Sequence, residues 1–158
     1  MHRFSILLIS ALVCLASCSS PQSKFEQAFS IKLPTGLVVR HEYLFSRGEY
    51  TAFLYAAILD GDREAFIGLV RQLGLQQWKD AVLAGRPDAL SAVFEPLAES
   101  AAPWWNPPSA GEQEASEDSY FRRDTDPAKR QQTTIVAQYS GTNIYLWKKG
   151  LWPYPRRE

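Results

Sequence analysis

VVRHEYLFSRGEYTAFLYAAIL, residues 38–59, contains two runs of β-favouring residues separated by a polar break. Each run alternates with a period of two, as expected for a strand whose successive side chains point to opposite faces of a sheet. The break at 46–49, Ser-Arg-Gly-Glu, has the composition of a turn. The stretch therefore predicts a β-hairpin. One parity of its first run holds Val39, His41, Tyr43 and Phe45.

The segment that follows, residues 60–74, predicts a helix. Asp60-Gly61-Asp62 suits the helix start, because an Asp carboxylate accepts hydrogen bonds from the free N–H groups of the first turn. Gly74 is placed to cap the C-terminal end. Between them the apolar residues recur at i, i+3, i+4 and i+7, which gives one apolar face: Phe66, Leu69, Val70 and Leu73.

Two further helices have weaker signals. Residues 76–84 place Trp78, Ala81 and Val82 on one side, and Gly85 ends the segment. Residues 87–97 begin with a proline at a favoured first position and then repeat the apolar spacing. Pro96 must bend or end this helix.

Residues 100–119 are predicted to form a long loop. Its first half, Pro-Trp-Trp-Asn-Pro-Pro at 103–108, is stiffened by proline and carries two large rings, so we expect it to pack on the domain. Its second half, 111–118, is rich in acidic and small residues, and we expect it to be solvated and mobile.

The last part of the chain predicts a second hairpin. Residues 120–123 form a short strand, 133–139 alternate as another, and 144–147 pair back across a turn at 140–143. We expect the chain to leave the sheet from Lys148 onward, because the tail contains prolines. The predicted fold is α+β: an antiparallel sheet of four to five strands built from two hairpins, with helices packed on one face.

The N-terminus has a different character. His2-Arg3 precedes an apolar run at residues 4–13, and Leu15-Ala16-Ser17-Cys18 follows. A charged start, an apolar middle and small residues before a cleavage site are typical of a secretory signal peptide. The last four residues resemble the lipobox of bacterial lipoproteins. The alternative is a membrane-spanning helix, but the apolar run is shorter than the roughly 20 residues needed to span a bilayer.

The resemblance implies cleavage before Cys18 and attachment of a diacylglyceryl group to its thiol, with acyl chains such as palmitate holding the protein on a membrane. Ser19 is not the aspartate that resembles an inner-membrane retention signal, so the periplasmic leaflet of the outer membrane is favoured if the source is Gram-negative. The expected divisions are a signal peptide at 1–17, a lipidated tether at 18–32 and a single domain at 33–158. A short helical turn built on Phe25 and Phe29 is the alternative to a flexible tether.

The composition of the chain argues against nucleic acid as a partner and against a disulfide or a metal site. The formal net charge is zero and becomes slightly negative once Arg3 is removed, so no basic excess attracts nucleic acid. Cys18 is then the only cysteine, which leaves no disulfide. One histidine and no free thiol do not make a zinc site. We expect no metal and no cofactor.

Catalytic motifs are not found. His41 is the only histidine after the signal peptide, and nothing resembles a nucleophile elbow around a serine; we expect His41 to lie on one face of the sheet. The carboxylates at 112–118 are numerous, but a shifted pKa for acid–base catalysis needs a fixed apolar site. We therefore expect no catalytic residues and no enzyme activity.

Aromatic residues provide the candidate binding residues. Exposed indoles at Trp104 and Trp105 can stack on sugars or anchor a protein, since Trp is enriched at binding hot spots. The alternative is that both rings cover the core. Trp152 and Tyr154, interleaved with basic residues, can contact an anionic envelope surface, or the tail can serve solubility.

These observations support a membrane-anchored envelope lipoprotein whose domain binds another protein as an accessory, inhibitor or immunity-type factor. The alternative is a module that binds peptidoglycan or lipopolysaccharide glycans through exposed Trp residues.

Overall fold

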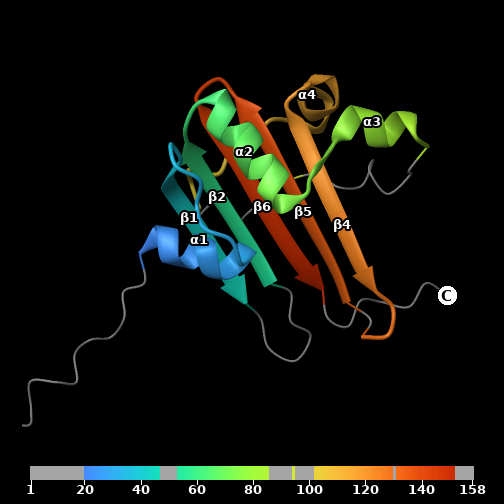
Figure 1. The fold of residues 1–158 in the computed structure, drawn as a ribbon, viewed down its shortest axis with the longest axis horizontal. Coiled ribbons are helices and arrows are strands. Elements are labelled where there is room, and N and C mark those ends of the chain that lie inside the picture. The colour runs from blue at the N-terminus through green and yellow to red at the C-terminus, as the bar shows by residue number, and fades with distance from the viewer. Residues whose placement is uncertain (1–19, 47–52, 86–93, 95–101, 130, 152–158) are drawn as a thin grey trace, which may run out of the picture.

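The computed structural model describes residues 20–46, 53–85, 94, 102–129 and 131–151. These residues form one antiparallel sheet with the strand order β1-β2-β6-β5-β4-β3 (Figure 1). The predicted α+β fold is confirmed, with six strands where four to five were expected. The bounds are β1 Val38–Ser46, β2 Phe53–Asp60, β3 Gln76–Gln77, β4 Ser119–Asp126, β5 Gln131–Ser140 and β6 Asn143–Leu151.

Both predicted hairpins are present, and the pairing of β2 with β6 joins them into one sheet. β6 continues to Leu151, so the expectation that the chain leaves the sheet at Lys148 is wrong. The prolines that prompted it, Pro153 and Pro155, lie beyond the end of the strand. The strand that raises the count, β3, has two residues, too few for alternation to reveal it.

Helix α2, Arg63–Leu73, confirms the strongest helical prediction. The Asp62 carboxylate accepts a hydrogen bond from the Ala65 amide at 2.8 Å, as an N-cap does. Gly74 ends the helix with φ at 62°, a conformation that costs glycine little. Its predicted apolar face is buried: Phe66, Leu69, Val70 and Leu73.

The short helix α3, Trp78–Leu83, buries Trp78 and Ala81 as predicted. Val82 was expected on the same side, but its side chain is exposed. Among residues 86–101, where a further helix is predicted at 87–97, the structure describes only Phe94, whose ring is buried. The rest of that prediction lies outside the described residues.

Helix α1, Pro21–Phe29, differs from the flexible tether expected at 18–32. Ser20 caps it by accepting from the Ser23 amide at 3.1 Å, and Pro21 occupies the first helical position. Phe25 and Phe29 are buried, and the Phe29 ring meets Tyr55 of β2 edge-on at 5.4 Å. The packed domain thus includes α1, upstream of the expected start at residue 33.

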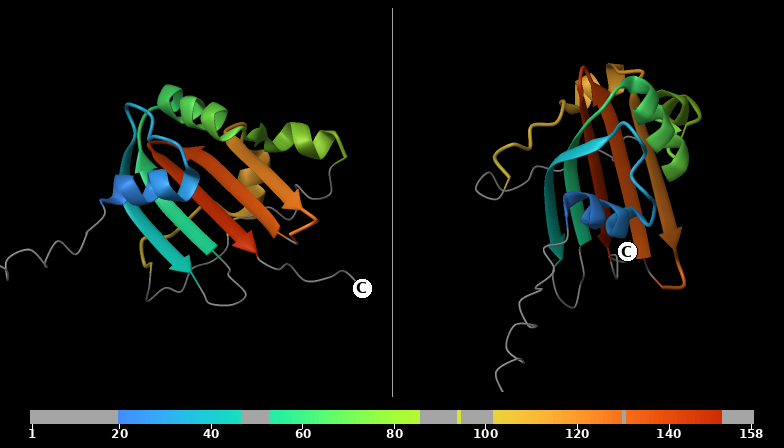
Figure 2. Two further views of the ribbon diagram at one scale, coloured as in Figure 1. Left: turned by 60° about the horizontal axis from the view of Figure 1, so that its bottom comes forward. Right: turned by 60° about the vertical axis from the view of Figure 1, so that its left-hand side comes forward.

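The sheet buries apolar side chains on both faces. One cluster lies under α1 and α2 and includes Tyr55, Ala57 and Leu59 of β2. The other includes Ala56 and Ile58, the alternate residues of the same strand, with Trp78 and Trp105. Because successive strand residues point to opposite faces, the clusters lie on opposite sides of the sheet. Figure 2 shows residues 102–109 crossing the face opposite α1 and α2.

A β-bulge at Arg40 breaks the alternation expected along β1. Val39 pairs with Leu59, but the next paired residue is His41, opposite Ile58. Val39 therefore lies on the α1 and α2 face, whereas His41, Tyr43 and Phe45 lie on the other. The period-two alternation predicts all four residues on one face, and for Val39 this prediction is wrong.

Helix α4, Ala110–Ala115, occupies part of the segment expected to be a mobile loop. It begins with a capping box, in which Ser109 accepts from the Glu112 amide and the Glu112 carboxylate accepts from the Ser109 amide at 2.7 Å. Gln113 is buried, which ties the helix to the domain. The Ser-x-x-Glu pattern at 109–112 is the sequence signal for this start.

Replacing Tyr55 with phenylalanine is expected to stabilise the domain by about 1 kcal/mol at neutral pH. The Tyr55 hydroxyl is buried and has no hydrogen-bond partner among the described residues, so its removal relieves a desolvation cost. Burial, with a contribution from the Glu42 carboxylate, also raises the pKa of Tyr55 far above its usual value. The phenol then ionises more readily in the unfolded chain, whose tyrosine pKa is about 10.

Below pH 10 the phenol is neutral in both states and stability does not depend on its titration; above pH 10 the protein with Tyr55 loses about 1.4 kcal/mol of stability per pH unit, because only the unfolded chain releases the proton. Urea unfolding of both proteins between pH 8 and pH 11.5 measures this difference. The stability curves should diverge above pH 10, with Tyr55→Phe losing less. Parallel curves would show that the phenol is not buried.

Candidate functional site

Trp105, one of the predicted binding residues, is part of the core. Its indole is 9% exposed and packs edge-on against Phe94 at 5.6 Å and against Tyr145 of β6 at 6.0 Å. The Trp105 amide donates to the Ala102 carbonyl at 3.0 Å, which turns the chain so that the ring faces the sheet. This geometry corresponds to the core-packing alternative.

Trp104, the preceding residue, is closer to the surface than Trp105, and its side chain is half-buried. Its indole stacks on the imidazole of His41, with ring centroids 5.2 Å apart and planes 16° apart, and meets Trp105 edge-on at 5.9 Å. One indole face is therefore occupied by a ring of the protein itself. Trp104 is therefore not the fully exposed indole that the sugar-stacking interpretation requires.

His41 lies on β1, on the face crossed by residues 102–109, in agreement with the prediction that it belongs to one sheet face. The ring placed against it is the Trp104 indole. Such stacking supplies packing between β1 and the crossing segment; it does not provide a proton acceptor or donor.

The acidic residues near the sheet ends have structural partners. Asp60 forms an ion pair with Arg40, and Asp62 caps α2. Within the described part of the chain, no group of three or more His, Cys, Asp or Glu side chains is arranged to hold a metal ion. The helix-cap interpretation of Asp60-Gly61-Asp62 holds for Asp62.

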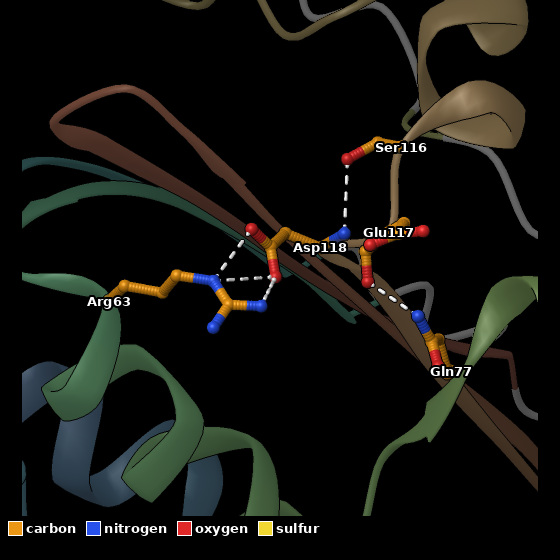
Figure 3. Close-up of polar contacts among 5 residues, drawn as sticks. All are labelled: Arg63, Gln77, Ser116, Glu117 and Asp118. Atoms are coloured by element: carbon orange, nitrogen blue, oxygen red, sulfur yellow. Dashed lines mark hydrogen bonds and ion pairs between the residues drawn. The ribbon is translucent and has the colours of Figure 1, made fainter.

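Figure 3 shows how the start of β4 is fixed. Arg63 of α2 holds the Asp118 carboxylate through two nitrogens, with Nη2 to Oδ1 at 2.7 Å and Nε to Oδ2 at 3.0 Å. Gln77 donates to the Glu117 carbonyl at 2.7 Å, and the Asp118 amide donates to Ser116 at 3.1 Å. The Asp118 carboxylate, which was expected to be solvated, thus joins α2 to the segment between α4 and β4, and the main-chain carbonyl of Glu117 joins β3 to it.

Lys148 was assigned to a basic tail, and the structure instead places it inside β6. Its ammonium donates to the Ala28 carbonyl at the end of α1 and lies over the rings of Phe29, at 5.3 Å, and Phe53, at 5.7 Å. Burial lowers the pKa of Lys148, and the positive charge of Arg122 adds to this. A cavity of about 430 Å³ lies beside it, also lined by Lys24 and Leu44. A lysine at the negative end of a helix dipole stabilises the helix, so this contact holds α1 on the sheet.

Among the described residues, β1 forms one edge of the sheet and carries exposed apolar side chains. β1 pairs with β2 and with no other strand among the described residues. Val38, Leu44 and Phe45 are 63%, 46% and 37% exposed, and the other large apolar residues described as exposed, Val82 and Leu83, lie on α3. The charges of β1 are paired within the chain, Arg40 with Asp60 and Glu42 with Lys24 at 2.6 Å. An unpaired strand edge with apolar side chains is a template for another strand.

The opposite edge is different. There β4 is covered by the two-residue strand β3 only at Tyr120 and Phe121. The remainder, residues 122–126, carries four charged side chains in five positions. Charged residues on an edge discourage pairing with another chain. Of the two edges, β1 is the one suited to a partner.

Three predicted site residues, Cys18, Trp152 and Tyr154, lie outside the described residues. In the part of the chain that is described, no helix has the length and hydropathy needed to cross a bilayer. Comparison with known protein families, curated proteins and solved structures gives no match for the chain.

Proposed function

We propose that the protein is a lipid-anchored envelope protein whose domain binds another protein by adding a strand of that partner to the edge of β1. The observation that carries the proposal is the outer edge of β1, which pairs with no strand among the described residues and has Leu44 and Phe45 exposed on it. In strand addition, main-chain hydrogen bonds supply affinity and alternate side chains supply specificity.

The partner segment follows from the chemistry of the edge. Leu44 lies on the α1 face and Phe45 on the opposite face, because they pair with Tyr55 and Leu54. Since the charges of β1 are already paired, a neutral segment with apolar side chains on both faces fits this edge. The proposed occupant is such a segment of a different envelope protein, not a second copy of this chain.

The proposed lipid anchor is inferred from the lipobox-like residues 15–18. With Cys18 lipidated, only Ser19 separates the anchored residue from Ser20, the N-cap of α1. The domain would then lie close to the membrane surface, without a long tether. Cys18→Ser should abolish labelling by an alkyne analogue of palmitate and release the protein from the membrane fraction.

Photo-crosslinking in intact cells tests the binding edge. A photoreactive residue at Leu44 or Phe45 of the full chain is expected to give a discrete adduct with one other protein, mapped to an extended apolar segment. The same probe at Thr125, an exposed residue of the charged β4 edge, is the matched control and should give none. Phe45→Lys should reduce the Leu44 adduct at least about tenfold, because an apolar contact is replaced by a charge.

Two outcomes would overturn the proposal. Equal crosslinking at Leu44 and Thr125 would show that the edge is not selective. An adduct made of two copies of this chain would show that β1 pairs with itself.

A further inference from the structure

A second cavity, independent of the β1 edge, lies at the end of the sheet where β5 turns into β6. It has a volume of about 590 Å³, within the range of small-molecule sites. Its floor includes Gln138 and Tyr145, which are directly paired on β5 and β6. Its wall is the segment from Asn106 to Glu112 that leads into α4. Strand residues and a proline-stiffened segment thus face one another across the cavity.

The cavity floor contains a polar side chain, Gln138, whose acceptor oxygen has no hydrogen-bond partner among the described residues. Gln138 is 3% exposed, and this Oε1 atom is buried. Directly across the β4–β5 pair, Ser119 is 1% exposed and its hydroxyl is also without a partner among the described residues. Buried polar groups are nearly always hydrogen-bonded, so a buried amide on a cavity floor indicates that a ligand or water completes the bond.

Hydrogen bonds within the protein orient the side chains of the cavity wall in the absence of a ligand. Glu112 is fixed by the capping box, in which its Oε2 accepts from both the amide and the hydroxyl of Ser109 at 2.7 Å. Ser116 is fixed by the Asp118 amide, and Asp118 is held in turn by Arg63. A site whose polar groups are already oriented loses less entropy on binding.

The chemistry of the lining defines the ligand. Glu112 is the only charged residue among the side chains that line the described cavity, and the bonds from Ser109 hold its pKa below the usual value, so it carries a negative charge. The ring of Tyr145 and two prolines supply apolar surfaces, and the Gln138 amide and the Glu112 carboxylate supply acceptors. This combination disfavours anions and suits a ligand with hydroxyl or amide donors around an apolar ring face.

We propose that this cavity binds one or two units of a neutral saccharide. The acceptor of Gln138 would receive a sugar hydroxyl or acetamido N–H, and an aromatic ring of the lining would contact the C–H face of the pyranose. The site is distinct from Trp104 and Trp105, although Trp105 lies 6.0 Å from the Tyr145 ring and can report binding by fluorescence.

Titration of the purified protein with tri-N-acetylchitotriose and with maltotriose, followed by amide chemical shifts, tests the proposal. Saturable shifts centred on Gln138, Ser140 and Tyr145 are expected for at least one of them. Gln138→Leu should weaken binding by about tenfold or more, since it removes the acceptor while keeping the volume. The same substitution at Gln27, an exposed residue of α1, is the matched control and should leave binding unchanged.

Charge selectivity provides a second readout. Trigalacturonate should bind much more weakly than the neutral sugars, and Glu112→Gln should reduce the difference, because glutamine keeps the capping box and removes the charge. Absence of saturable binding by both neutral sugars, unchanged binding in Gln138→Leu, or preferential binding of trigalacturonate would each overturn the proposal. Phe45→Lys should not alter sugar binding, so failure of one proposal is distinguishable from failure of the other.

Discussion

Replacing Phe25 with alanine is expected to destabilise the domain by about 3–5 kcal/mol. The Phe25 ring is fully buried, packs on Phe29 with centroids 4.9 Å apart and meets Tyr55 of the sheet at 6.4 Å. Its loss removes the transfer free energy of a large side chain and leaves a cavity that α1, held at both ends, can fill only in part. Urea unfolding monitored by circular dichroism measures the effect.

The control is Gln27→Ala on the same helix, whose side chain is exposed. It should change the free energy of unfolding by no more than about 0.5 kcal/mol. If Phe25→Ala were as stable as the unchanged protein, α1 would not be docked on the sheet, and residues 18–32 would be the flexible tether that the sequence predicts.

The contrast between α1 and α2 explains what the sequence could predict. Both helices have an N-cap signal, but α2 has four apolar residues at helical spacing and a glycine at its end. α1 has nine residues, and Phe25 and Phe29 are its only large apolar side chains. A helix this short is unstable alone and forms because it docks. Its contacts, with Tyr55 and with Lys148 more than a hundred residues away, cannot be seen locally.

The bulge at Arg40 is a second limit of local patterns. The first hairpin, with its two antiparallel strands, was predictable because both the alternation and the turn are visible in consecutive residues. One inserted residue in a strand reverses the faces of those that follow. The sequence shows no interruption there, since Val38, Val39, His41 and Tyr43 are acceptable on either face of the sheet. As a result, the stacking of His41 on Trp104 could not be anticipated.

The candidate binding residues illustrate the same point for function. Adjacent tryptophans in a proline-rich loop are compatible with both binding and packing, and neither composition nor spacing distinguishes the two. The structure separates them, since Trp105 is buried in the core and Trp104 covers its edge. Gln138 gave no signal in the sequence, because its importance comes from a buried Oε1 atom that has no hydrogen-bond partner among the described residues and lies beside a cavity.

Trp105→Ala is expected to destabilise the domain by about 3–5 kcal/mol, comparable to the loss of Phe25. Trp105 contacts Phe94, Trp104 and Tyr145, so its removal leaves a cavity on the sheet face opposite α1 and α2. Thermal and urea unfolding measure the loss. Because Tyr145 also lines the cavity proposed to bind saccharides, this variant should in addition weaken sugar binding.

Trp104→Ala is the matched comparison, with the same side chain removed one residue away. It should cost about 1–2 kcal/mol, because the ring is half-buried and loses the stacking on His41 together with the edge contact to Trp105. The relative losses of stability in Trp105→Ala and Trp104→Ala distinguish a packing role from a binding role for these two residues. If Trp105→Ala left stability unchanged while a partner or glycan no longer bound, the indole would be a binding residue and the packed position of residues 102–105 would be wrong. A large loss of stability for Trp105 and a small one for Trp104 would instead show that the pair holds the crossing segment on the sheet, which leaves the β1 edge and the Gln138 cavity as the surfaces on which to search for ligands.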